Sequence, residues 1–418
     1  MKINKIVVSL FTAGLMATPL AHATNGYFSH GYGIKAKGMA GAGIALPQDS
    51  IAAATNPAGM VLLGDRSDLG LDWFKPTRES TISGNMFGAN GTYDGNGKSN
   101  FFVPEIGYNK KLNSDMSLGV SVYGNGGMNT QYDTNPFAAF GSSGAAGINL
   151  EQLFIAPTWA MKLNSSHSIG VALNLVYQTF SATGLQAFSS MSSNAAALTN
   201  NGKDSSTGVG LRLGWTGEVT PMLSMGATYQ PKTKMSKFSK YAGLFAEQGG
   251  FDIPATYGLG IAVKATTATT VAVDYQAIQY GDVRSVANTF SAGGALGADN
   301  GAGFGWKNVT VLKLGVSQVM SDTLTMRAGY SHNSQPIPAS QTLFNILAPG
   351  VVQDHLTIGA TWNLSKQNEL TVGYMHAFSK KVNGAGSIPA GNPPGMGGGE
   401  ANIKMHEDSL GVAYSWKL

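Results

Sequence analysis

From about residue 67 to the end of the chain, apolar side chains alternate with small or polar ones. In 168–179, for example, Ile169, Val171 and Leu173 share one face, while Gly170 and Ala172 face the other way. One apolar face kept up over about ten residues is typical of a strand that crosses a membrane in a barrel. The segments that show this pattern are 67–84, 99–112, 116–132, 149–163, 167–186, 207–219, 222–238, 251–265, 268–288, 305–320, 322–335, 353–364, 368–382 and 403–418.

The connections between these segments alternate between very short and long. Outer-membrane barrels have short turns on the periplasmic side and long loops outside, and a closed barrel needs an even number of strands. The sequence therefore predicts an all-β fold, a fourteen-stranded antiparallel transmembrane barrel over 67–418. Aromatic residues near the segment ends, such as Trp73, Trp362 and Trp416, fit the two interfacial girdles of such a barrel.

The first residues have the features of a secretory signal peptide. Lys2 and Lys5 precede an apolar stretch at 6–20, and Ala21-His22-Ala23 is a suitable cleavage site. We expect residues 1–23 to be removed before Thr24, and the mature chain to reside in the bacterial outer membrane. With no cysteine, the chain has neither disulfides nor a lipoprotein anchor.

Composition excludes several other classes of protein. Only 12% of the residues are charged, about half the usual share, and 56 are glycine. The net charge of +4 gives no case for nucleic-acid binding. The histidines are scattered without ligand spacing, and neither a nucleophile elbow nor a complete phosphate loop is present. We expect no metal, no cofactor and no enzymatic activity.

The stretch 38–60 precedes the first predicted strand and fits neither a helix nor a strand. It is rich in Gly and Ala, and Pro57 fixes a turn at Asn56-Pro57-Ala58. Such a compact, nearly uncharged segment suits packing inside the barrel, so we predict that residues 24–66 form a plug.

Residues 35–60 resemble the N-terminal segment of the FadL family of outer-membrane transporters, including its TodX-like branch. In that family this segment is a hatch inside a fourteen-stranded barrel, and an Asn-Pro-Ala turn is its hallmark. Asn56, Pro57 and Ala58 match that turn. The resemblance extends over the mature chain, although Leu418 stands where these barrels usually end in an aromatic residue.

Segment 116–132 resembles the family's third strand, which has a kink that opens the barrel wall. Asn125, Gly126 and Gly127 lie where the kink would be, and clustered glycines in a strand mark a bulge or bend. The alternative is a merely glycine-rich strand. Segments 324–340 and 369–382 also resemble family strands.

Two long loops contain apolar side chains among polar ones. In the family, loops in these positions form an outward-facing groove that captures the substrate, and exposed apolar residues suit that role. Alternatively, these side chains pack on each other and cap the barrel. The candidate groove residues are Phe137, Phe140, Ile148, Phe188, Met191 and Leu198.

Basic residues on the strands are candidate partners for a substrate carboxylate. Periodicity points Arg327 inward most securely, and Arg212 and Lys313 are further candidates. Alternatively, these side chains pair with Asp274 or Glu218 to fill the lumen.

The resemblance implies passive uptake of hydrophobic compounds, with long-chain fatty acids as the family default. The substrate would be captured in the outer groove, pass to an interior apolar pocket and leave sideways at the kink. Expected partners are hydrophobic small molecules, outer-membrane lipid and lipopolysaccharide, and the barrel-assembly machinery, with the chain a monomer. The alternatives are an aromatic-hydrocarbon channel, a hydrophilic porin, and a structural or adhesive surface barrel.

Overall fold

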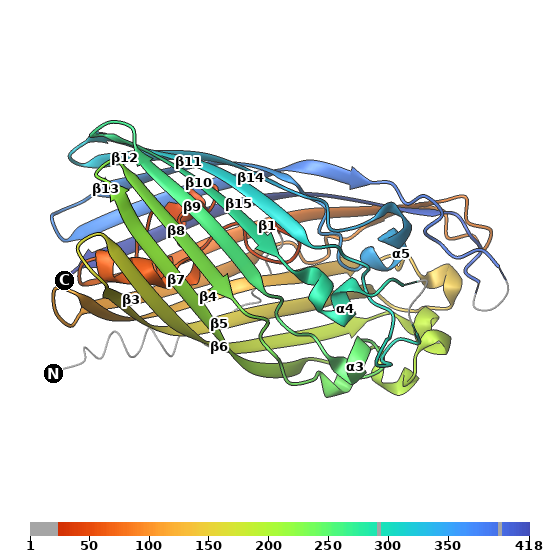
Figure 1. Ribbon diagram of the computed structural model, residues 1–418. Helices are drawn as coiled ribbons and strands as arrows, with labels where there is room; N and C mark the ends of the chain where they lie inside the picture. Colours follow the sequence, from red (N-terminus) through yellow and green to blue (C-terminus); the bar gives the residue numbers. More distant parts are fainter. Residues whose placement is uncertain (1–23, 291–293, 392–394) are drawn as a thin grey trace.

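The computed structural model describes residues 24–290, 294–391 and 395–418, so the predicted signal peptide lies outside the described residues. The strands follow one another around a single antiparallel sheet, and β15 pairs with β1 to close it (Figure 1). Fourteen strands form the wall; the short β2 pairs only with the end of β1. The predicted fourteen-stranded antiparallel barrel is confirmed.

The strands are β1 (Arg66–Ser83), β2 (Gly91–Asp94), β3 (Phe101–Lys111), β4 (Met116–Tyr132), β5 (Ala146–Lys162), β6 (His167–Thr183), β7 (Asp204–Thr220), β8 (Leu223–Gln230), β9 (Thr256–Lys264), β10 (Thr269–Ile278), β11 (Val309–Ser321), β12 (Leu324–Asn333), β13 (Asp354–Asn363), β14 (Asn368–Val382) and β15 (Glu400–Lys417). The α-helices of the described residues are all short: α2 (Ile34–Lys37), α3 (Ala246–Gly249), α4 (Arg284–Ala287) and α5 (Thr342–Asn345). Short 3₁₀ helices occur at Ala52–Ala54, Pro57–Leu62, Ala138–Phe140, Gln186–Met191, Ala195–Ala197, Ser239–Tyr241, Tyr280–Asp282 and Ala339–Gln341. None of the described helices is long and apolar enough to cross a membrane.

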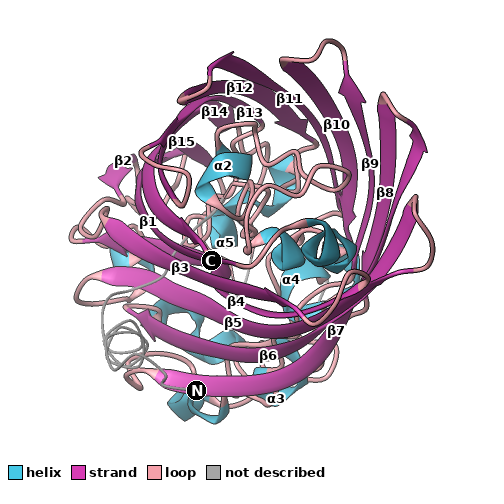
Figure 2. Ribbon diagram, turned by 90° about the vertical axis from the view of Figure 1, so that its left-hand side faces the viewer, coloured by secondary structure: helices cyan, strands magenta, loops and turns pink. Residues whose placement is uncertain are grey.

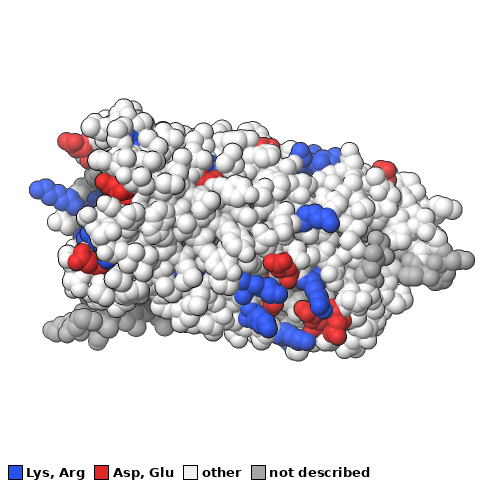
Figure 3. All heavy atoms as spheres, viewed as in Figure 1, with Lys and Arg blue, Asp and Glu red and all other residues white. Residues whose placement is uncertain are grey.

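The outer face of the wall is apolar because it meets lipid. On β7, Val209, Leu211 and Leu213 point outward with 63%, 44% and 43% of their surfaces exposed. Charged side chains are correspondingly scarce over a broad middle band of the face in Figure 3 and gather toward the two ends. This pattern is that of a barrel whose outer surface is solvated by hydrocarbon.

Most predicted strand positions match the structure, but several predictions extend beyond their strands. The prediction 251–265 begins before β9, which starts at Thr256, and 305–320 begins before β11, which starts at Val309. The prediction 222–238 overruns β8, which ends at Gln230, and 268–288 overruns β10, which ends at Ile278. Beyond Gln230, exposed lysines alternate with buried residues along an extended loop, so the same pattern continues where only the isolated bridges Gly208–Met235 and Thr233–Ile253 remain. Beyond Ile278 the chain turns into the 3₁₀ helix Tyr280–Asp282 and α4. The short strand β2 was not predicted.

Residues 24–65, which we call the inner segment, lie inside the barrel, with α2 visible in its lumen (Figure 2). Glycines on the inner face of the wall let the segment approach closely. A Cβ on Gly170 of β6 would come within 2.4 Å of the Pro57 carbonyl carbon, and one on Gly214 of β7 within 1.9 Å of the Asn56 side-chain oxygen. The wall glycines therefore make room for the turn at Asn56-Pro57.

Candidate functional site

The Asn56-Pro57-Ala58 turn is anchored between the inner segment and the wall. The Asn56 side-chain amide donates to the main-chain oxygens of Ile44 (2.8 Å) and Trp215 on β7 (2.9 Å). Its side-chain oxygen accepts the N–H of Ala58 at 3.1 Å and so caps the 3₁₀ helix Pro57–Leu62. One buried side chain thus joins three stretches of main chain.

Lys37, on α2, carries a charge deep inside the barrel. Its ammonium group lies 2.8 Å from Asp72 on β1 and 2.9 Å from Glu105 on β3. Burial alone would lower the pKa of Lys37, but the two carboxylates together raise it above its ordinary value. The inner segment is therefore tied to two neighbouring strands by a buried charge cluster. Loss of any one member would leave an uncompensated charge in the interior.

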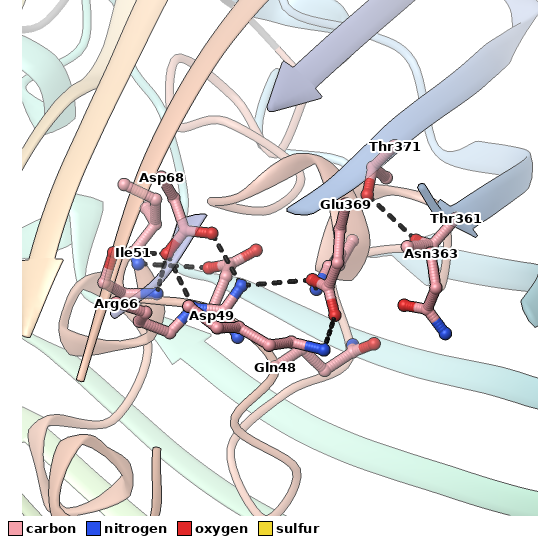
Figure 4. Close-up of polar contacts among 12 residues, drawn as sticks. Gln48, Asp49, Ile51, Arg66, Asp68, Thr361, Asn363, Glu369 and Thr371 are labelled. Carbon is pink, nitrogen blue, oxygen red and sulfur yellow. Dashed lines mark hydrogen bonds and ion pairs between the residues drawn. The ribbon is translucent and has the colours of Figure 1, made fainter. Parts of the chain in front are cut away.

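A second polar cluster lies where the inner segment meets β1 and β14 (Figure 4). Arg66 pairs with Asp68 at 2.7 Å and lies 3.4 Å from Glu369, which also pairs with Lys35 of α2. Asp49 lies in the same network without a salt bridge, and burial and the Asp68 carboxylate raise the pKa of Asp49 to about 6. These contacts lie near the short turns, at the periplasmic end.

The wall is discontinuous between β3 and β4. Paired positions on these strands run from Ser117 to Val122 of β4, whereas β4 pairs with β5 along its length with a bulge at Asn125. Asn125, Gly126 and Gly127 therefore lie where β4 has left β3. This part of β4 is paired with β5 on one side but not with β3 on the other.

The inner segment covers this discontinuity from within. Ser29 donates its main-chain N–H to the Asn125 oxygen at 3.0 Å, and Gly127 donates to the Tyr27 oxygen at 2.9 Å. A Cβ on Gly126 would come within 1.9 Å of the Tyr27 oxygen, so only glycine allows this approach. Further out, Gln131 exchanges main-chain hydrogen bonds with Gly95 and Gly97.

Residues 25–28 are held by an aromatic cluster in the extracellular half of the lumen. The Tyr280 hydroxyl donates to the Asn25 oxygen at 2.5 Å and accepts the N–H groups of Tyr27 and Phe28, both at 3.2 Å. The Tyr27 ring packs against Tyr280, Phe251 and Trp306 with centroid separations of 5.0, 5.8 and 6.0 Å. Tyr280 therefore links an extracellular loop to the residues that cover the β3–β4 discontinuity.

The predicted groove residues do not form an exposed apolar surface. Phe137, Phe188 and Leu198 are fully buried, and Ile148, which belongs to β5, is only 3% exposed. The Phe137 and Phe188 rings pack edge to face at 5.0 Å. Our expectation of exposure was wrong for these four, because the two loops bury their apolar side chains against each other. Phe140 and Met191 remain partly exposed beside them.

The three candidate basic residues all point inward, and all contact the inner segment. Arg327 donates to the Gln48 side chain (2.8 Å) and to Thr361 (2.7 Å), and Lys313 donates to the main-chain oxygen of His30 (2.8 Å). Arg212 donates to the main-chain oxygen of Thr55 (3.5 Å) and to the Gln230 side chain (2.8 Å). In the described part of the chain none of the three forms an ion pair with Asp274 or Glu218.

Arg212, Lys313 and Asp274 line a small polar cavity between the inner segment and strands β7 to β11. Its volume is about 20 Å³, which accommodates about one water molecule. The Nε atom of Arg212 and one carboxylate oxygen of Asp274 are buried there without a hydrogen-bond partner among the described residues. Within those residues, no group of three His, Asp or Glu side chains is placed to hold a metal ion.

Sequence reasoning missed the buried lysines of α2 and the anchoring role of Tyr280. A signal for the lysines was present, since Lys35 and Lys37 begin a stretch predicted to be buried, and buried ammonium groups need acidic partners. No local signal marks Tyr280, because its partners lie about 250 residues away along the chain.

Comparison with known proteins identifies the family. Residues 15–392 match the model of the outer membrane protein transport proteins, OMPP1/FadL/TodX. The chain belongs to this family. The long-chain fatty acid transport protein of Escherichia coli K12 is 24% identical over 425 residues, covering 90% of this chain and 94% of that protein.

Solved structures of family proteins share the fold of this FadL/TodX-family member. The crystal structure of a Pseudomonas aeruginosa FadL homologue has a TM-score of 0.72 at 16% identity, covering 94% of this chain and 99% of that one. The toluene transporter TodX of Pseudomonas putida has a TM-score of 0.69 at 17% identity, covering 93% and 99%. The family is one of outer-membrane transport proteins, as the sequence predicted.

Proposed function

We propose that this chain mediates passive uptake of hydrophobic molecules across the outer membrane, with long-chain fatty acids as its substrates. The observation that supports this most is the discontinuity between β3 and β4, covered from inside by Tyr27–Ser29. When these residues move off β4, an apolar molecule in the lumen gains a sideways path into lipid. The inner segment acts as the hatch, and Asn56-Pro57-Ala58 holds it in place.

The energetics need no external source of work. Burying a fatty acyl chain yields about 0.8 kcal/mol per methylene, so ten methylenes give about 8 kcal/mol, a micromolar dissociation constant before association costs. Transfer from an apolar lumen into lipid exchanges one apolar medium for another. Release sideways is therefore close to neutral in free energy.

Two features support fatty acids over uncharged hydrocarbons. The relative of 24% identity is a long-chain fatty acid transport protein. In addition, Arg212 has, among the described residues, an unpartnered guanidinium N–H at a polar cavity beside the inner segment, and such a group suits a carboxylate. The cavity holds about one water molecule and is shared with Asp274, so a fatty acid reaches this N–H only when the inner segment moves. Arg327 is a weaker candidate for that role because its Nε and Nη1 already donate to Gln48 and Thr361.

Aromatic hydrocarbons are the second candidate substrates. The rings of Tyr27, Phe251, Tyr280 and Trp306 surround the path, and edge-to-face packing suits a small aromatic guest. Entry would begin at the partly exposed Phe140 and Met191, because the other predicted groove residues are buried.

The test is uptake of labelled oleate and labelled toluene, side by side, by cells lacking their own transporter of this type. Oleate uptake that falls on exchange of Arg212 for Gln assigns fatty acids; toluene uptake alone assigns aromatic hydrocarbons. Uptake of neither compound contradicts the proposal.

A bulky residue at the discontinuity tests the exit route in the same cells. We expect Gly127→Phe to reduce uptake about tenfold while the barrel still assembles. Gly64→Phe is the control, since a Cβ at Gly64 meets nothing within 4 Å. Equal uptake by the Gly127→Phe and Gly64→Phe variants would rule out the proposed sideways exit.

A further inference from the structure

The outer surface of β12 to β15 carries the same polar cluster twice. In the first, one carboxylate oxygen of Asp354 on β13 accepts the Tyr330 hydroxyl (2.5 Å) and lies 2.7 Å from Nδ1 of His332. In the second, Asp408 on β15 accepts the Tyr374 hydroxyl (2.6 Å) and lies 2.8 Å from Nδ1 of His376.

The repeat is also visible in the sequence. Gly329-Tyr330-Ser331-His332 on β12 corresponds to Gly373-Tyr374-Met375-His376 on β14, and each histidine faces its aspartate on the next strand. Neither cluster faces the lumen, so transport through the interior does not account for them.

The second cluster lies where the outer surface changes from apolar to polar. His376, Asp408 and Lys75 are consecutive cross-strand partners on β14, β15 and β1. The row of cross-strand neighbours two residues nearer the periplasm is apolar. It consists of the exposed side chains Tyr374, Leu410, Trp73 and Phe102. Lipid-facing rings beneath a polar row mark the boundary between hydrocarbon and head groups.

Lysines lie near these clusters and form no ion pair within the described residues, although the exposed Glu79 of β1 is the cross-strand partner of Lys404. Lys381 on β14 and Lys404 on β15 are direct cross-strand neighbours, and both are exposed. Like charges in this position repel one another unless an anion lies between them. Lys75, Lys381 and Lys404 form no ion pair within the described residues.

We propose that Lys75, His332, His376, Lys381 and Lys404, the rim patch, bind the phosphate groups of the phosphorylated glycolipid of the outer leaflet. Ammonium groups and protonated imidazoles are suitable donors to phosphate oxygens. Each aspartate accepts the Nδ1–H of its histidine and leaves Nε2 without a partner among the described residues, so Nε2 donates to a phosphate when the ring is an imidazolium. The acyl chains lie against Tyr374, Leu410 and Trp73 directly below. A soluble anion would make no use of that apolar surface.

Lys203 lies just before β7 and Lys232 just after β8, and both are already paired. Lys203 lies 3.1 Å from Glu151 and Lys232 lies 3.8 Å from Asp252. Exchanging these two lysines removes two positive charges, against three in the rim-patch variant, and provides the control. The rim patch is independent of which compound crosses the lumen.

The test uses the purified mature chain in mixed micelles of detergent and diphosphorylated lipid A, with bound lipid counted by native mass spectrometry. We expect K75Q/K381Q/K404Q to weaken lipid A binding at least about tenfold, H332N/H376N to weaken it less, and K203Q/K232Q to stay within about twofold of the unaltered chain. Heat-modifiable migration on gels shows that each barrel is folded.

Two further probes distinguish the lipid from other anions. Dephosphorylated lipid A should bind the unaltered chain as weakly as lipid A binds the triple lysine variant, and inorganic phosphate should not compete at millimolar concentration. Equal binding by the triple and control variants would overturn the proposal. Competition by inorganic phosphate would also overturn it. So would the finding that the chain forms a dimer from which exchange of the lysines releases no lipid.

Discussion

The side-chain amide of Asn56 donates a hydrogen bond to the main-chain oxygen of Trp215 on β7, at 2.9 Å. The same side chain also bonds Ile44 and Ala58. One asparagine thus sets the position of the inner segment against the wall, which is the structural basis for several predictions.

Asn56→Ala should loosen the inner segment without unfolding the barrel. Two buried main-chain oxygens would lose their partner, and each such loss costs about 1–3 kcal/mol. We expect faster amide hydrogen exchange across residues 43–60 and unchanged exchange in β11 to β14. Asn383→Ala, at an exposed loop position, is the control. Protection that is equal in the two variants would show that Asn56 does not anchor the segment.

Lys37→Met should be strongly destabilising. It leaves the buried carboxylates of Asp72 and Glu105 without the ammonium that lies within 3 Å of both, and breaking a buried pair costs about 3–5 kcal/mol. Adding D72N and E105Q to K37M should recover a large part of that loss, because no buried charge then remains in the cluster. The urea midpoint of each folded barrel measures the effect. A triple variant no better than K37M would mean that packing, rather than charge, dominates.

Asp49 should give the stability of the protein a pH dependence in mildly acidic solution. Its pKa is about 6 in the folded chain against 3.8 ordinarily, so the folded state binds the proton more tightly. Proton binding by Asp49 therefore adds at most about 3 kcal/mol to the free energy of unfolding below pH 4. This stabilisation is lost as the pH rises through 6. Asp49→Asn should remove this loss and be the more stable protein at pH 7.

Urea midpoints of the two chains at pH 4 to 8 measure this effect. The difference between the chains should grow over that window and then level off. A constant difference would contradict the raised pKa of Asp49.

Tyr280→Phe should free the residues that cover the discontinuity. It removes the hydroxyl that bonds Asn25, Tyr27 and Phe28 but keeps the ring that packs on Tyr27. We expect cells that lack their own transporter of this type to take up labelled oleate about two- to fivefold faster with this variant. Tyr275→Phe is the control, because Tyr275 lies on the outer surface. Uptake that is unchanged in Tyr280→Phe would show that residues 25–28 do not limit passage.

The barrel was predictable from sequence because lipid imposes a strict rule on every strand. Outward positions must be apolar at every second residue, so β4 and β14 were predicted with the bounds that the structure shows. Beyond the membrane that rule no longer applies. The alternation of Lys232, Thr233, Lys234 and Met235 therefore looked like a strand but belongs to a loop.

The interior was less predictable because its contacts join distant parts of the chain. The bulge at Asn125 was foreseen from the adjacent glycines, but its cover by Tyr27 and Ser29 was not. Likewise, Phe137 and Phe188 looked exposed one loop at a time. The sequence left open whether the two loops pack on each other, and the fold shows that they do.

The central claim is that the substrate leaves sideways between β3 and β4. The most direct measurement is photo-crosslinking with a fatty acid that carries a diazirine at the end of its chain, followed by mapping of the labelled peptides in uptake-competent cells. Our account predicts labels on β3 and on β4 beyond Val122, and few labels elsewhere. Labels concentrated around Gln48, Asp49 and Thr361, at the periplasmic end of the inner segment, would show exit along the barrel axis and contradict it.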